Sequence, residues 1–438
     1  MIRLGLLAHG IGGRLDLPVP LAFFAAGGAV VLIGTFLALG TLWLRPRLQD
    51  GPRYRATGRT VRLGALNILG VVGLGLVILA GIGPLVGRGE EGGARNIGPV
   101  LVWVYFWLVV PFLGAFLGDL YTGINPWRTL SHWLAIGDRD RPVGNGGPGR
   151  RIGLWPATVL LVAVAWLELV YPGSADPATL TIAAVIFSAF LLATIGRYGR
   201  ETALSSFDPF TSYNRLISSI SPFGRDSEGR LVHRGWLRAL VVVPEWPGLG
   251  AFAVVMIGTV SFDGLSATSW WEAATGDFGA SVSGRTVLLI AMCLAIGGTY
   301  FLACFLAVRL GGGGRRASQV ASRFAHTLVP IAFAYAFAHY FTLIIFEGQS
   351  LVSAASDPFS LGWDLFGTRS YKINFFLGAL PVWYIQVVAI VLGHVAGVVL
   401  AHDRALVDFK GARAMRSQYA MLLLMVLLTT LGLFILAG

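Results

Sequence analysis

The chain is poor in charge: Asp, Glu, Lys and Arg make up only 13% of its 438 residues. A soluble globular domain is closer to about a quarter charged. Apolar residues make up 55%, and the mean hydropathy is +0.72. This composition excludes an ordinary water-soluble protein and points to a protein of the lipid bilayer.

Cysteine is almost absent, with Cys293 and Cys304 as the only two. Both fall in one predicted helix, where their separation along the axis is roughly 16 Å. That is beyond disulfide reach, so a disulfide framework is excluded and both are interpreted as small core residues. With only six methionines, the sequence also has no Met-rich stripe of the kind that carries copper.

Long apolar runs are what the sequence has in abundance. A membrane-spanning helix needs roughly 20 apolar residues, and only helices satisfy their own backbone in lipid. The sequence therefore predicts an all-α, polytopic helical bundle with about ten transmembrane helices. The predicted spans are 19–44, 62–86, 98–118, 153–172, 178–196, 237–260, 285–308, 324–346, 374–402 and 418–437.

The net charge of +11 is distributed unevenly between the two sides of this arrangement. Alternate connections carry 26 of the 33 Lys and Arg, and the other side carries the remaining seven. The basic side faces the cytoplasm, which places both termini outside. The basic excess is thus an orientation signal, and no nucleic-acid partner is expected. The basic connections are 45–62, 119–152, 197–238, 309–323 and 403–417.

Residues 1–18 are expected to form a short external segment that also has features of a remnant signal peptide. Cleavage after Ala8 would leave His9 as a free N-terminus, whose amine and imidazole together chelate metals. Residues 19–438 are expected to form a single transmembrane domain.

Two short motifs in the basic connections resemble each other. Asn125-Pro126-Trp127 and Asp208-Pro209-Phe210 each open an amphipathic stretch, near 124–136 and 207–221. Proline suits the first turn of a helix, and the spacing predicts short helices in the cytoplasmic interface. The match between the motifs hints at an internal repeat in parallel orientation.

Four of the seven histidines fall in two predicted spans, Phe324–Phe346 and Asn374–His402, or at their ends. An ionisable residue inside a bilayer is expensive, and it indicates a functional site by default. We expect the rest of the chain to hold these two helices side by side. The four are His326, His339, His394 and His402.

Three polar residues are predicted to share one layer in the outer half of the bundle. Counting the helical rise from the cytoplasmic ends places Glu168, His339 and Gln386 at depths of roughly 23–24 Å. Tyr335 and Thr342 share a helix face with His339 by the three- and four-residue spacing. These side chains are candidates for a catalytic or substrate-binding site.

The chemistry of this layer allows several functions. A histidine with a carboxylate suits a divalent transition metal such as copper or zinc. Glu168 and His339 equally suit a proton or ion relay in a transporter or permease. A third alternative is purely structural: the polar groups hydrogen-bond to one another and fix the packing of the helices.

Haem binding is a further alternative, in a membrane redox subunit. His326 and His339 are related by about 140° around the helix, and His394 and His402 by about 80°. Neither pair is aligned for two stacked haems. One haem or metal between the two helices remains open, with His326, His394 and His402 as its candidate ligands.

Several segments resemble a group of bacterial, mainly actinobacterial, membrane proteins labelled fenitrothion hydrolase. The resemblance implies a multi-pass protein of the bacterial cytoplasmic membrane that hydrolyses an organophosphate triester and releases a nitrophenol. The segments that carry it are HGIGGRLDLPVP, INPWRTL, HTLVPIAFAYAFAHYFTLIIFEGQ (326–349), SDPFSLGWDLFG (356–367) and VLGHVAGVVLAHDRAL (391–406).

A neutral, apolar triester suits a site reached from the outer leaflet. Our hypothesis is metal-assisted hydrolysis, in which a bound metal lowers the pKa of a water molecule. His339 and Glu347 are the expected metal or substrate ligands, joined by His9, and Glu168 is the expected base. Tyr335, Thr342 and Gln386 are expected to contact the substrate.

Overall fold

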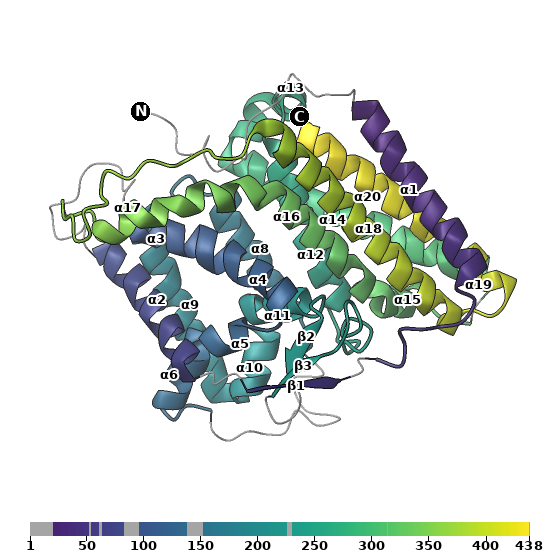
Figure 1. The fold of residues 1–438 in the computed structure, drawn as a ribbon, viewed down its shortest axis with the longest axis horizontal. Helices are drawn as coiled ribbons and strands as arrows, with labels where there is room; N and C mark the ends of the chain where they lie inside the picture. The colour runs from purple at the N-terminus through teal and green to yellow at the C-terminus, as the bar shows by residue number, and fades with distance from the viewer. Residues whose placement is uncertain are drawn as a thin grey trace.

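Helices account for most of the chain, and they pack side by side in one bundle (Figure 1). The computed structural model describes residues 21–51, 54–60, 64–82, 96–137, 152–225, 230–312 and 314–437. The external segment 1–18, with His9, lies outside these residues.

Eight helical segments within the described ranges are long and apolar enough to cross a membrane. Two of the predicted spans form shorter apolar helices, Asn67–Ile82 and Trp155–Leu169. The prediction of an all-α, polytopic membrane bundle is therefore confirmed. The eight are Ala22–Leu42, Ile97–Leu117, Pro177–Tyr198, Leu249–Ser266, Val282–Gly311, Ala317–Ile345, Ala379–Asp408 and Ala412–Ala437.

The bundle is assembled from long helices joined by shorter ones. The long elements are α1 (Leu21–Leu42), α2 (Gly64–Ile82), η3 (Val100–Val109), α8 (Trp155–Leu169), α9 (Pro177–Tyr198), α12 (Leu249–Ser266), α14 (Val282–Gly311), α16 (Val329–Ile345), α18 (Ala379–Asp408) and α20 (Tyr419–Ala437). The shorter ones are α3 (Ile97–Pro99), α4 (Val110–Leu117), α5 (Tyr121–Ile124), α6 (Pro126–Trp133), α10 (Arg200–Ser206), α11 (Pro209–Ser218), α13 (Ser269–Ala280), α15 (Ala317–Phe324), η4 (Ala325–Leu328), η5 (Glu347–Gln349), α17 (Ser350–Ser356) and α19 (Ala412–Ser417).

Helix η3 is a ten-residue π-helix, a rare conformation that is frequent at functional sites. The N–H of Val110 bonds to the carbonyl of Tyr105, five residues back. Pro111 offers a physical reason, since it has no N–H and its ring crowds the carbonyl of Trp107 in a regular helix. Widening the helix relieves that clash.

Helix α12 lies at the centre of the bundle, where it contacts α8, α14 and α16. Residues 252–265 of this helix are all buried. The sequence predicts this span at 237–260, but the helix begins at Leu249 and ends at Ser266. The predicted span was therefore too near the N-terminus. Pro244 and Pro247 disfavour helix at the residues before them, and Gly248 has a φ of +85°.

A small sheet joins two of the basic connections. Strand β3 (Arg230–His233) pairs antiparallel with both β1 (Arg55–Thr60) and β2 (Phe223–Arg225). Both β2 and β3 lie in the basic connection 197–238, and β1 lies in the connection 45–62. Figure 1 shows the sheet at one end of the bundle, opposite to α13 and the C-terminus.

The outward face of the spans is apolar. Val30, Ile186 and Leu294 are examples, with 68%, 65% and 69% of their surface exposed. Exposed apolar patches of this extent belong to proteins that contact lipid or a partner. Together with the eight spanning segments, they identify a multi-pass membrane protein in contact with the bilayer.

Candidate functional site

Asp263 is the centre of a polar contact between two buried helices, α12 and α16. It lies one turn before the end of α12 and is 2% exposed. Its Oδ2 atom lies 2.9 Å from Nε2 of His339 and accepts a 2.8 Å hydrogen bond from the Tyr340 hydroxyl. Two adjacent residues of α16 therefore share one carboxylate oxygen of α12.

The contact between the two helices is made close by a glycine. A methyl group at Gly264 would lie 3.3 Å from Nδ1 of His339, so the imidazole packs against the α12 backbone. The His339 side chain is 12% exposed and that of Asp263 is 3%. Since the carboxylate accepts, the hydrogen-bond network assigns the Nε2 proton to His339.

Glu168 approaches the same cluster from α8. It lines a cavity of about 10 Å³ together with Tyr340, Tyr213 and Trp107. The Trp107 indole is within hydrogen-bonding reach of the Glu168 carboxylate, and Glu168 and Asp263 interact electrostatically. A cavity of this size is close to the smallest that accommodates one water molecule.

One cation stands near the two acids. The Arg285 guanidinium on α14 donates a 2.8 Å hydrogen bond to the carbonyl of Leu169, which ends α8. Its charge also interacts with Asp263. Buried carboxylates are costly unless paired, and Arg285 offsets part of that cost.

These groups form a proton-exchange cluster, here defined as Glu168, Tyr340, Asp263 and His339. The His339 imidazole and the Tyr340 hydroxyl contact the Asp263 carboxylate directly, and Glu168 and Tyr340 line the same small cavity. Such chains of acids and histidines in membrane spans mark proton pathways. The cluster also contains a histidine oriented by a carboxylate, which is the arrangement of a general base.

The other predicted residues on the His339 face have different neighbours. The Tyr335 hydroxyl donates to the carbonyl of Leu428 on α20, and its ring lies 5.8 Å from that of His394. The Thr342 hydroxyl is buried and has no hydrogen-bond partner among the described residues. Neither side chain contacts the proton-exchange cluster through a hydrogen bond in the described structure.

Gln386 makes a structural contact between two helices. Its Nε2 donates a 2.7 Å hydrogen bond to the carbonyl of Ala338, which ties α18 to α16. Glu347 follows α16 in η5, where partial burial raises the pKa of its carboxyl. Among the described residues, Glu168 lines a cavity of about 10 Å³ whose walls include neither His339 nor Gln386.

The remaining intramembrane histidines are separate from one another. His394 is fully buried, with Nδ1 2.8 Å from the carbonyl of Ile390. Both nitrogens of His402 are engaged, Nδ1 by Gln418 and Nε2 by the carbonyl of Trp43. His326 is 3% exposed, and its Nε2 has no partner among the described residues.

Metal ligands in proteins are mainly His, Cys, Asp and Glu side chains that converge on one point. Within the described ranges, no group of three or more His, Cys, Asp or Glu side chains converges on one point. His339 and Glu347 therefore do not complete a metal site with described residues, and His9 lies outside them.

The two similar motifs meet each other in the structure. Asn125 donates hydrogen bonds of 3.1 Å to Asp208 and 3.0 Å to Thr211. The ring of Trp127 stacks on that of Phe210, with centroids 6.2 Å apart. Helices α6 and α11 thus begin side by side. Helix α11 is buried against α4, α8 and α16, so it is inserted into the bundle and does not lie on its surface.

Sequence reasoning missed Asp263, Tyr340 and Tyr213. Asp263 was placed in the external connection after 260, because the predicted span began and ended too early. Tyr340 is adjacent to His339, and the same depth count would have found it. Tyr213 was treated as part of an interfacial helix face, although α11 carries it to the cavity beside Glu168.

Comparisons with known proteins add no relative. No family model, curated protein or solved structure matches this chain.

Proposed function

We propose that this protein is a proton-coupled membrane transporter whose proton site is the cluster of Glu168, Tyr340, Asp263 and His339. The observation that carries the proposal is the sharing of one Asp263 oxygen by His339 and Tyr340, at 2.9 and 2.8 Å. The cluster joins α8, α12 and α16. A change in its protonation therefore alters the contacts between three helices.

The relay works through short transfers. When a second proton reaches His339, the imidazolium passes its Nε2 proton to the Asp263 carboxylate and returns to neutral imidazole. The Tyr340 hydroxyl then accepts that proton from Asp263 and releases its own toward the small cavity. Tyr340 also borders the small cavity that Glu168 lines, so one water molecule there would link Glu168 to the Tyr340 hydroxyl, which bonds to Asp263. Two carboxylates that interact electrostatically inside the bundle favour a shared proton over two full charges.

A transport cycle follows from the cost of burial. When the cluster loses a proton, its added negative charge is poorly solvated inside the bundle. Rearrangement of α12 relative to α16 exposes the cluster to water and relieves that cost. Such rocking of helix groups around a fixed site is how alternating access operates in transporters.

Proton flux in reconstituted vesicles tests this function. Liposomes containing the protein and a trapped pH-sensitive dye are given an acid pulse, with the membrane potential clamped by valinomycin and potassium. We expect dye quenching with the native protein and its loss in Asp263→Asn and Glu168→Gln. Gln386→Leu is the matched control, because Gln386 also bonds to α16, at the Ala338 carbonyl, but is not part of the cluster. Equal flux in Asp263→Asn and native protein would reject the proposal.

A membrane hydrolase is the second candidate, and the Asp263–His339 pair favours it. A carboxylate that orients a histidine produces a general base. In hydrolysis of an organophosphate triester, His339 takes a proton from water, the water oxygen bonds to phosphorus, and the bond to the nitrophenolate breaks. The resemblance to bacterial fenitrothion hydrolases supports this second candidate. It also implies a location in a bacterial cytoplasmic membrane.

The two functions are separated by one assay. The detergent-purified protein is incubated with fenitrothion, and the release of nitrophenolate is followed by its visible absorbance. A hydrolase releases product in detergent and loses that activity in His339→Ala. A transporter shows no turnover in detergent and retains proton flux in vesicles.

A further inference from the structure

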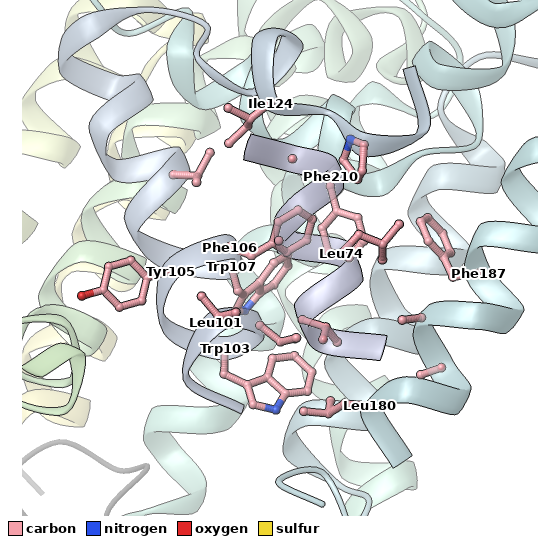
Figure 2. Close-up of a pocket in the computed structure, with 18 of the residues that line it drawn as sticks. Leu74, Leu101, Trp103, Tyr105, Phe106, Trp107, Ile124, Leu180, Phe187 and Phe210 are labelled. Carbon is pink, nitrogen blue, oxygen red and sulfur yellow. The ribbon is translucent and has the colours of Figure 1, made fainter. Parts of the chain in front are cut away.

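We propose that a second site, separate from the proton-exchange cluster, binds one hydrocarbon chain of a membrane amphiphile. The site is an apolar cavity of about 360 Å³ between α2, η3 and α9 (Figure 2). Cavities of roughly 300–1,000 Å³ are the size of ligand pockets in general. This inference does not depend on the proposed transport function.

The walls of the cavity select an apolar ligand. They are formed by aliphatic and aromatic side chains, among them Leu74, Phe106 and Phe187. The indole N–H groups of Trp103 and Trp127, two of the three lining tryptophans, are already used, at 2.8 Å to the carbonyl of Ser174 and 2.9 Å to Ser188. A polar ligand group would lose its hydrogen bonds with water and gain few in return.

The shape favours an extended chain over a compact molecule. Figure 2 shows Ile124 at one end of the cavity and Leu180 with Trp103 at the other. The lining residues of α2 run from Leu69 to Val77, a rise of about 12 Å along the helix. An alkyl chain lying along α2 fills such a volume.

The π-helix explains why this wall is so wide. With hydrogen bonds to the fifth residue, side chains four and five positions apart fall on one face. Leu101, Phe106 and Val110 accordingly share the cavity wall, with Val102 and Tyr105 beside them. A regular helix would turn some of these side chains away.

The cavity adjoins the lipid-facing surface. Leu69, which lines it, is 59% exposed, and Ile68 and Val72 on the same helix are 55% and 51% exposed. Ile186 on α9 is 65% exposed. A chain therefore enters from the bilayer, where hydrocarbon chains are the surrounding solvent.

Gly73 leaves empty space at the cavity wall, which a larger side chain can fill. It lines the cavity, and a methyl group added there would meet no atom within 4 Å. Gly75 on the same helix also has nothing within 4 Å but does not line the cavity. Gly73→Leu fills the site, and Gly75→Leu is its matched control, since both substitutions have the same effect on helix propensity.

The experiment is photo-crosslinking. The purified protein is irradiated with a fatty acid, or with a phosphatidylcholine, that carries a diazirine in mid-chain, and labelled residues are located by mass spectrometry. We expect labels on Leu74 and Phe106, an approximately tenfold loss in Gly73→Leu (about 1.4 kcal/mol), and no loss in Gly75→Leu. The probe that labels identifies whether the chain comes from a free acid or a phospholipid.

Three results would contradict the proposal. Labels confined to Val72 and Ile186, or undiminished cavity labelling in Gly73→Leu, would overturn the proposal. So would the absence of labelling by both probes. If Gly73→Leu does not fold, Ala183→Leu fills the cavity from the α9 wall and is subject to the same criteria.

Discussion

Asp263 and His339 face each other between α12 and α16, with Oδ2 and Nε2 2.9 Å apart. The two residues are 76 positions apart in the chain, and the contact is almost fully buried. The Tyr340 hydroxyl completes it by donating to the same oxygen.

Asp263 and His339 are expected to be energetically coupled. Asp263→Ala leaves the His339 and Tyr340 donors unsatisfied, at about 1–3 kcal/mol for each buried group. The double variant Asp263→Ala/His339→Ala should therefore be less destabilised than the sum of the single variants, by about 0.5–3 kcal/mol. Denaturant unfolding in detergent measures the three differences. Strict additivity would show that the contact carries no coupling.

Replacement of Glu168 by glutamine is expected to leave stability unchanged or to raise it. The substitution preserves the side-chain volume and removes a buried ionisable group, and exchanging a buried charge for a neutral group is often neutral or stabilising. Thermal unfolding followed by tryptophan fluorescence gives the comparison. A marked fall in the melting temperature would mean that the charge on Glu168 stabilises the fold.

Asp208 is expected to make stability depend on pH with a defined sign. Burial raises the pKa of its carboxyl from 3.8 to about 6, against the opposing hydrogen bonds from Thr211, Phe210 and Asn125. Since the folded state then binds the proton more tightly, this contribution is fully present below about pH 4 and lost as the pH rises to about 6. The full shift corresponds to about 3 kcal/mol.

The measurement is the difference between native protein and Asp208→Asn, taken by thermal unfolding across that pH range. The difference should change by the predicted amount between pH 4 and 6 and stay flat above. Glu201 provides a control of opposite sign, because the Arg128 hydrogen bond lowers its pKa, so its contribution is lost as the pH falls. A flat difference for Asp208→Asn would refute the raised pKa.

Asp403 is expected to hold the connection after α1 in place. Its carboxylate accepts from the Trp43 indole at 2.9 Å, the Arg47 backbone at 2.6 Å and the Gln49 amide at 2.8 Å. Asp403→Ala removes all of these acceptors, so protease cleavage near Arg47 should become faster. Asp364→Ala, in another polar loop, is the control. Equal cleavage rates in the two variants would show that Asp403 does not fix this segment.

The sequence was sufficient to predict the helices of the bundle because lipid imposes a simple rule on length and polarity. It failed where tertiary contacts decide. Strand β1 lies more than 160 residues before its partner β3, and neither Arg55–Thr60 nor Arg230–His233 shows an alternating apolar pattern. Nothing local in these segments signals their pairing.

Only part of the candidate site could be predicted from the sequence, for a related reason. Depth along a helix is set by residue count, which predicts a similar level for Glu168 and His339, and Tyr340, the neighbour of His339, lines one cavity with Glu168. Rotation and neighbour identity depend on packing, and these decide that Gln386 bonds to the Ala338 carbonyl while His339 meets Asp263. Asp263 was not predicted to lie within a membrane span, because the predicted span ended at residue 260.

The most direct test of the central claim asks whether the buried carboxyls change protonation. Infrared difference spectra of the reconstituted protein between acidic and alkaline buffer record the carbonyl stretch of protonated carboxyl groups. The account predicts a band that is reduced in both Asp263→Asn and Glu168→Gln and retained in Thr342→Val. Identical spectra for native protein and Asp263→Asn would contradict it.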